Sequence, residues 1–206
     1  MKKILIFISL LIPSTQLFSQ TAADFFSATE ITWYGLDYSK AKMIGSLGFT
    51  NPGEIKARYF DSWNLIVPTE PFKYNIKSAF KKKNVNYSLE MIKKRNAEKV
   101  NPQELVIDTK YSLEEKEIQN IVNEYEPDEK SGIGVVFIVE SYDKYKAKAF
   151  IYVTVFDINS KKVLIVKKME GIGQGFGLRN YWAYSTYKVI VAAKKEYKNW
   201  EKMYRK

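Results

Sequence analysis

The stretch GIGVVFIVESYDKYKAKAFIYVTVFDINSKKVLIVKKMEGIGQGFG (residues 132–177) decides the fold. Within residues 132–140, five consecutive apolar residues from Val135 to Val139 are mostly β-branched, which is typical of a strand covered on both faces. Two further strand-like runs with a polar turn between them predict an antiparallel hairpin over residues 147–166. We therefore expect a buried strand beside a hairpin.

A long helix is expected directly after this stretch. Between about residues 178 and 203, four apolar residues recur at intervals of 7, 4 and 7 and so share one helical face. This face should lie across the sheet. The four residues are Trp182, Val189, Ala193 and Trp200.

Upstream, strand-like and helix-like segments alternate. Residues 29–36 are rich in β-branched and aromatic types and predict the first strand, which an irregular loop follows up to about residue 53. An apolar stripe over residues 52–66 predicts a helix that Pro68 ends. A second amphipathic helix is expected to begin at Glu70 and to reach Phe80.

A capping-box spacing marks a further helix, because Ser112 is followed three residues later by Glu115. Alternating elements that end in a hairpin and a helix are typical of the α/β class. The sequence thus predicts a single α/β domain over residues 21–206. Its mixed sheet should carry a C-terminal antiparallel hairpin, with the long C-terminal helix packed on the sheet.

The first 20 residues are typical of a secretory signal peptide, since two lysines precede an apolar run too short to span a membrane. Cleavage is expected between Ser19 and Gln20 or just after Gln20. The sequence has no cysteine, so disulfides and a cysteine-linked lipid are excluded. No later stretch reaches the roughly 20 apolar residues of a transmembrane helix. We expect an exported, unlipidated protein in the periplasm or outside the cell.

The chain is strongly basic. Its formal net charge is +10, and removal of residues 1–20 takes away two lysines and no acid, leaving +8. Lys81–Lys83, Lys93–Arg95 and a C-terminal cluster form basic runs. Such runs favour either an anionic envelope component or acidic protein as partner, or solubility alone. Nucleic acid is not expected as a partner of an exported chain.

The absence of histidine and cysteine excludes the nucleophile systems that depend on them and ordinary zinc sites. No cofactor motif is present. Four carboxylates at strand ends make the only acid–base set that the sequence offers, and no pair of them has a diagnostic spacing. They are Asp37, Glu140, Asp157 and Glu170.

Four alternating glycines, beginning at Gly171, fill the bend before the last helix. A dinucleotide-binding loop would need glycine at position 176, where Phe176 stands. The bend could expose backbone N–H groups beside the positive end of the helix and form an anion or partner site. Alternatively, the glycines serve only the change of direction. The candidate residues are Gly173, Gly175, Gly177, Arg179 and Trp182.

Two segments, FDINSKKVL (156–164) and GIGQGFGLRNYW (171–182), carry a resemblance in the last third of the chain. The chain resembles uncharacterised secreted proteins of Bacteroidetes-type bacteria. More distantly, it is similar to small α/β domains of envelope-assembly proteins: the curli-secretion lipoprotein, the TolB amino-terminal domain and penicillin-binding-protein activator lipoproteins. The resemblance implies a non-enzymatic α/β domain, and no functional residue carries over from it.

Three hypotheses follow. The first is a secreted or periplasmic binding or assembly module of the cell envelope. The second is an enzyme built on carboxylates, which Asp37 and Glu170 lying together in a cleft would favour. The third is a carrier of a small anionic or aromatic ligand.

Overall fold

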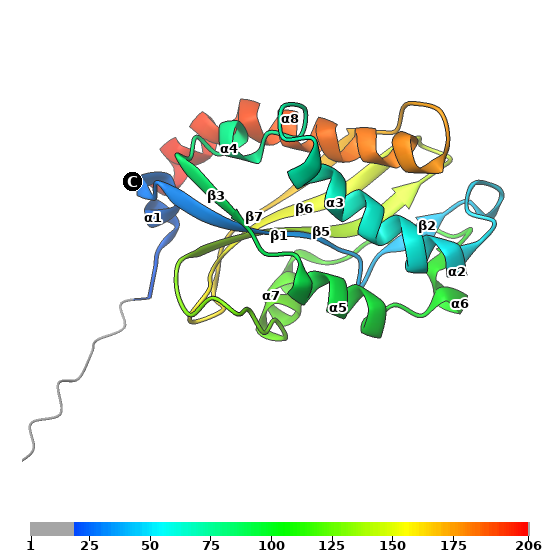
Figure 1. The fold of residues 1–206 in the computed structure, drawn as a ribbon, viewed down its shortest axis with the longest axis horizontal. Helices are drawn as coiled ribbons and strands as arrows, with labels where there is room; N and C mark the ends of the chain where they lie inside the picture. The colour runs from blue at the N-terminus through cyan, green and yellow to red at the C-terminus, as the bar shows by residue number, and fades with distance from the viewer. Residues whose placement is uncertain (1–18, 206) are drawn as a thin grey trace, which may run out of the picture.

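A computed structural model describes residues 19–205, in which one sheet lies between two layers of helices (Figure 1). Helices α3, α4 and α8 cover one face, and α5 and α7 cover the other. The predicted signal peptide falls almost entirely outside the described residues. The strands are β1 (Glu30–Asp37), β2 (Lys42–Ile44), β3 (Asn84–Tyr87), β4 (Val106–Ile107), β5 (Ile133–Asp143), β6 (Lys148–Asp157) and β7 (Val163–Ile172).

Helices of very different lengths connect these strands. The longest is α8, which spans 27 residues and crosses the sheet close to β6 and β7. The helical segments are α1 (Ala22–Ser27), η1 (Ser46–Gly48), α2 (Pro52–Glu54), η2 (Ile55–Tyr59), α3 (Phe60–Thr69), α4 (Ile76–Ala79), α5 (Glu90–Lys99), α6 (Pro102–Leu105), α7 (Glu115–Asn123) and α8 (Leu178–Tyr204).

The sheet is organised around β5. Strands β1 and β2 follow one another along one side of β5, both parallel to it, and β3 and β4 pair in parallel outside them. On the other side, β6 pairs with β5 and β7 pairs with β6, both antiparallel. The sheet is thus mostly parallel, and its antiparallel part contains three consecutive strands.

The α/β class and the long C-terminal helix packed on the sheet are confirmed. The predicted buried strand is also confirmed, because β5 has no exposed residue along its whole length. Its side chains alternate between two apolar clusters, with Val135, Phe137 and Val139 in one and Val136 and Ile138 in the other. A strand with both faces covered needs this continuous apolar pattern.

Three local predictions are corrected. The helix that begins at Pro52 ends at Thr69, one residue past Pro68. The expected helix from Glu70 is replaced by a turn and the four-residue α4, which starts anew because the Asn75 side chain accepts the Ser78 N–H group. The irregular loop before residue 53 contains the short strand β2.

The predicted capping box at Ser112 and Glu115 is also wrong. Helix α7 starts two residues later, with Glu114 and Glu117 as the reciprocal capping pair. The reason lies at Leu113, whose N–H group donates to the Glu140 carboxylate and whose carbonyl accepts the Tyr152 hydroxyl group. These two bonds to the sheet keep Leu113 outside the helix.

The outer edge of β1 is completed by side chains. Beyond Trp33 no strand pairs with this edge in the described residues, since β3 covers only the first four residues of β1. Asn64 on α3 accepts the Leu36 N–H at 2.6 Å and donates to the Leu36 carbonyl at 3.1 Å. Asn96 on α5 donates to the same carbonyl at 3.0 Å and accepts the Tyr38 N–H at 2.7 Å. Two amides thereby take the place of a neighbouring strand.

Gly35 makes this arrangement possible. Its φ angle of 105° lies in the left-handed region, and a Cβ atom there would lie 2.2 Å from Asn64 Oδ1. The pairing of β1 with β5 shifts register between Trp33 and Gly35, as at a β-bulge.

We predict that Gly35→Ala lowers the free energy of unfolding by about 2–4 kcal/mol, because it combines backbone strain with a clash against Asn64. Gly53→Ala is the matched control. Gly53 lies in helix α2 with only Asn51 Oδ1 near its Cβ position, at 3.7 Å, so alanine should leave stability equal or slightly higher. Urea denaturation measures both variants, and equal midpoints would contradict the role given to Gly35.

Lys82 fixes the N-terminal helix to the domain. Its ammonium group donates to the Phe25 and Ala28 carbonyls at the end of α1 and lies 4.4 Å from the centre of the Phe25 ring. Burial and the nearby Arg205 charge lower the pKa of Lys82 to about 8.

This pKa gives a pH dependence. Between about pH 8 and the ordinary lysine pKa of 10.5, the unfolded chain binds the proton that the folded chain has released, so stability contributed by Lys82 should rise with pH. We predict that Lys82→Met removes this rise. Other titrations are common to both proteins, so the difference between their urea midpoints isolates Lys82. Parallel pH curves for the two proteins would show that Lys82 does not titrate in this way.

Candidate functional site

A buried carboxylate stands at the end of β1. Asp37 accepts three hydrogen bonds, from the Ser39 N–H at 2.7 Å, the Tyr125 hydroxyl at 2.7 Å and Arg95 Nε at 3.1 Å. The side chains of Asp37 and Tyr125 are fully buried. These contacts bring together β1, α5 and the segment after α7, three parts of the chain that are distant in sequence.

Arg95 extends the cluster toward the surface. Its Nη1 atom lies 3.0 Å from Glu124, and Lys99 lies 3.8 Å from the same carboxylate oxygen. Burial acts to lower the pKa of Arg95, but the Asp37 and Glu124 carboxylates outweigh it and raise that pKa. The Arg95 hydrogen bond lowers the pKa of Glu124, and burial together with Asp37 raises that of Tyr125 well above its ordinary value. The cluster is therefore ionised at Arg95 and Glu124 and neutral at Tyr125 near pH 7.

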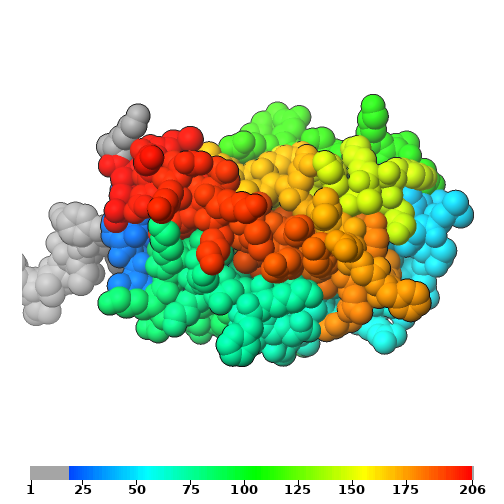
Figure 2. Space-filling model, turned by 90° about the horizontal axis from the view of Figure 1, so that it is seen from above, coloured from blue at the N-terminus to red at the C-terminus, as the bar shows by residue number. Residues whose placement is uncertain are grey.

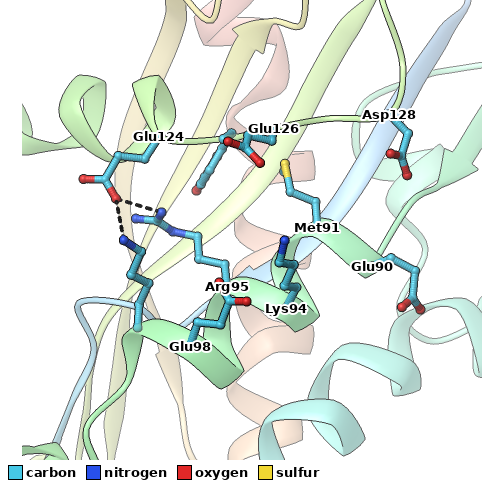
Figure 3. A pocket seen from close by; sticks show the side chains of 10 residues that line it. Glu90, Met91, Lys94, Arg95, Glu98, Glu124, Glu126 and Asp128 are labelled. Carbon is cyan, nitrogen blue, oxygen red and sulfur yellow. Dashed lines mark hydrogen bonds and ion pairs between the residues drawn. The ribbon is translucent and has the colours of Figure 1, made fainter.

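A cavity of about 670 Å³ opens in front of this cluster, between α5 and the segment that follows α7 (Figure 3). Arg95 reaches across it to Glu124, while Glu90, Glu98 and Asp128 stand around its rim. Its lining carries both signs of charge. The lining residues are Glu90, Met91, Lys94, Arg95, Glu98, Lys99, Glu124, Tyr125, Glu126 and Asp128.

The four carboxylates of the acid–base set do not come together. Glu140 is buried and bonds Lys168 at 2.7 Å, while the exposed Glu170 bonds Lys148. Two strands separate Asp37 on β1 from Glu170 on β7, so at a strand spacing of ~4.8 Å they lie at least about 14 Å apart. A cleft containing both residues, which would favour a carboxylate-based enzyme, is not formed.

Asp157 has structural partners. It begins the turn between β6 and β7, where it accepts the Asn159 N–H at 3.1 Å and the Ser160 hydroxyl at 3.0 Å. It also accepts the Gln20 N–H at 3.0 Å. These bonds account for the carboxylate without a catalytic role.

The glycine-rich bend divides into a packed half and an open half. A Cβ atom on Gly171 would lie 2.0 Å from the Ser185 carbonyl oxygen, and one on Gly173 would lie 2.2 Å from the Tyr181 ring. The absence of side chains at these glycines therefore allows α8 to pack closely against the bend. Gly175 and Gly177 have positive φ angles of 122° and 76° and lie on the surface. The glycines thus serve both close packing and the change of direction.

Arg179 and Trp182 are engaged elsewhere. Arg179 Nε donates to the Ser62 hydroxyl at 2.6 Å, and its carbonyl accepts the Trp63 indole N–H at 2.9 Å. Trp182 is fully buried and stacks on Tyr142 with ring centres 4.6 Å apart. Anion binding by Gly173, Gly175, Gly177, Arg179 and Trp182 stays a prediction.

The basic runs are only partly surface features. Lys82 and Arg95, from the two lysine-rich runs, are buried, and each has the internal partners described above. Their neighbours Lys81, Lys83, Lys93 and Lys94 are exposed. One cation of each run therefore stabilises the fold.

Sequence reasoning singled out the glycines of residues 173–177 but missed the surface that these residues share with residues 45–51 and 144–147, which we term the three-loop end. These loops gather at one end of the molecule, the right-hand end of Figure 2, in cyan, yellow-green and orange. The Gly173 N–H donates to the Ala147 carbonyl at 2.8 Å, and the Lys144 ammonium lies 4.0 Å from the centre of the Tyr181 ring. The loops are thus held together.

Large apolar side chains project from the three-loop end. Leu47 is 93% exposed, Phe176 is 96% exposed and Tyr145 is 67% exposed. Glycines flank two of them, as in Gly45-Ser46-Leu47-Gly48 and Gly175-Phe176-Gly177. A bulky apolar residue between loop glycines is the signal that would have pointed to this surface.

Within residues 19–205 no helix has the length and apolar character needed to cross a bilayer. In the same residues no three acidic side chains are grouped as metal ligands. Comparison of the chain with models of protein families, with curated proteins and with solved structures finds no match.

We predict that Asp37→Asn lowers the free energy of unfolding by about 3 kcal/mol, because it leaves the buried Arg95 charge without its fully buried carboxylate partner. Glu124→Gln removes the other carboxylate bonded to Arg95, whose side chain is half exposed, and should cost about 1 kcal/mol or less. Urea denaturation near neutral pH compares the two variants. A larger loss for Glu124→Gln would reverse our ranking of the two ion pairs.

Proposed function

We propose that this chain is an exported, non-enzymatic binding or assembly module of the bacterial cell envelope, and that it contacts its partner through the three-loop end. The observation that carries the proposal is the almost complete exposure of Leu47 and Phe176 on two loops at the same end of the molecule, with residues 144–147 bonded to one of them. Exposed apolar side chains grouped in this way mark interaction sites on soluble domains.

The energetics support binding at this end. Burial of one large apolar side chain contributes about 1.5–3 kcal/mol, so Leu47 and Phe176 together supply a substantial part of a binding free energy. Ser46 N–H and the Tyr145 hydroxyl both donate to Asp108 at 2.8 Å, which ties two of the loops to the segment after β4. Loops that are fixed before binding lose less entropy on contact.

The partner is an anionic envelope component or an envelope protein. The net charge of +8 after removal of residues 1–20 attracts anionic surfaces, and the exposed Lys144 stands among the apolar side chains of the three-loop end. Apolar side chains that insert and lysines that meet head groups are a common combination at anionic membranes.

One contact is compatible with the proposed cleavage before Gln20. The Gln20 nitrogen lies 3.0 Å from the Asp157 carboxylate. Cleavage after Ser19 would turn this amide into an ammonium group, and the same contact would become an ion pair. The bond therefore suits a chain that begins at Gln20.

The cavity beside Arg95 favours a second candidate, a carrier of a small anionic or aromatic ligand. It is large enough for such a molecule, and its lining holds three cations, Lys94, Arg95 and Lys99, beside five carboxylates. Thermal-shift measurements with small aromatic acids on wild type and Met91→Trp, which fills the cavity mouth, would separate this role from binding at the three-loop end.

We predict that the protein sediments with vesicles of phosphatidylglycerol and phosphatidylethanolamine and not with phosphatidylethanolamine alone. The double variant Leu47→Ser/Phe176→Ser should weaken this binding by about tenfold or more, because it removes the inserted apolar area. When it is immobilised in the same way as wild type, this variant should fail to retain the material that wild type retains from envelope extracts.

Phe72→Ser is the matched control. Phe72 is 98% exposed, but it lies in the turn after α3, at the far end of an 18-residue helical run from Pro52 that is about 27 Å long. Its replacement should change neither the binding to vesicles nor the retention of material from envelope extracts. If the Leu47→Ser/Phe176→Ser variant behaves like wild type in both, the three-loop end is not the contact surface. Retention from extracts without vesicle binding would identify a protein partner.

A further inference from the structure

Strand β7 forms an open edge of the sheet. Its only neighbour in the described residues is β6, and it is ten residues long. Figure 2 shows β7, in gold, running along one side of the orange and red helix α8. A long strand with one free side presents unpaired N–H and C=O groups that can accept another strand.

The outward-facing residues of β7 follow from its pairing with β6. The Gly173 N–H donates to the Ala147 carbonyl, and the register is regular from Lys148–Ile172 to Val155–Ile165. From Ile165 to Ile172, odd-numbered residues therefore direct their backbone groups to β6, and even-numbered residues direct theirs outward; before the register shift, Val163 directs its N–H outward.

Only the first residue of this edge has a partner. Gln119 on α7 accepts the Val163 N–H at 2.9 Å. Farther along β7, no hydrogen bond within residues 19–205 takes up the outward backbone groups of Val166, Lys168, Glu170 or Ile172. The open edge thus spans these four positions.

The side chains at these positions share the face opposite α8. Lys168 lies 2.7 Å from Glu140 on this face, whereas the adjacent Lys167 turns to the other face, toward Met203 of α8. Glu170 pairs with Lys148 at the same face as Lys168. Any strand added to the edge would meet the sequence Val, Lys, Glu, Ile along this face.

We propose that the edge of β7 pairs with β7 of a second copy of this chain, antiparallel and centred on Met169. In that register Lys168 lies opposite Glu170 of the second copy, and Val166 lies opposite Ile172, each pair occurring twice across the two-fold axis. Even-numbered residues then face even-numbered residues, so their outward N–H and C=O groups meet.

The neighbouring registers are less favourable. A pairing centred on Lys168 sets two lysines opposite each other, and one centred on Glu170 sets two glutamates opposite each other. Like charges directly opposite across strands are destabilising. The Met169 register also continues an alternating row of charges, in which Lys148, Glu170, Lys168 and Glu140 follow one another across the two copies.

The test measures self-association by analytical ultracentrifugation over a range of protein concentrations. Wild type should form a concentration-dependent dimer. Lys168→Glu places glutamate opposite glutamate, Glu170→Lys places lysine opposite lysine, and each variant alone should dimerise at least about tenfold more weakly. An equal mixture of the two variants should dimerise again, because each mixed pair then joins lysine with glutamate.

Lys167→Glu is the matched control, since it makes the same charge change at the adjacent position on the face covered by α8. It should dimerise like wild type. Recovery in the mixture also shows that both variants are folded, and circular dichroism of each variant checks this independently. A monomeric wild type, wild-type-like dimers of both charge variants, or failure of the mixture to dimerise while both remain folded would overturn the proposal.

Discussion

The free outer edge of β1 beyond Trp33 is the constraint on which much of this structure depends. Because no strand among residues 19–205 covers that edge, Asn64 and Asn96 supply the hydrogen bonds of the missing neighbour. Their helices, α3 and α5, are thereby fixed on opposite faces of the sheet, and Gly35 must lack a side chain. One residue before Asn96, Arg95 reaches the Asp37 carboxylate from the same helix. Adjacent residues of α5 thus supply hydrogen bonds to the β1 backbone and the cation of the buried ion pair.

The sequence predicts those elements whose pattern is long enough to exclude alternatives. The apolar run of β5 and the repeating apolar face of α8 were both identifiable, because burial on a fixed face imposes a period over many residues. Short elements carry no such period. Strand β2 has three residues and exists because β5 pairs with it, and α7 begins late because Leu113 bonds to the sheet. Both outcomes are set by contacts distant in sequence.

The candidate site was predictable only in part for the same reason. Asp37 was identified as a strand-end carboxylate, but Arg95 looked like one cation of an exposed run, and nothing local distinguishes it from Lys94. Its burial follows from the position of β1 over α5. The glycines of residues 173–177 were a predicted partner site, but their grouping with loop 45–51 was missed, because the two loops are separated by more than a hundred residues and become neighbours through β5 and β6. Spatial grouping of exposed side chains has no signature in a single segment.

The two edges of the sheet differ in a way that bears on assembly. The β1 edge is closed by side chains of its own domain, whereas the β7 edge has backbone groups free for another strand. Strand β7 runs toward the three-loop end, since its last residue, Ile172, leads directly into residues 173–177. In an antiparallel pair, the two three-loop ends would therefore point in opposite directions. Such a dimer could not place both ends on one flat surface, so the proposed pairing favours a bridge between two partners over a clamp on one.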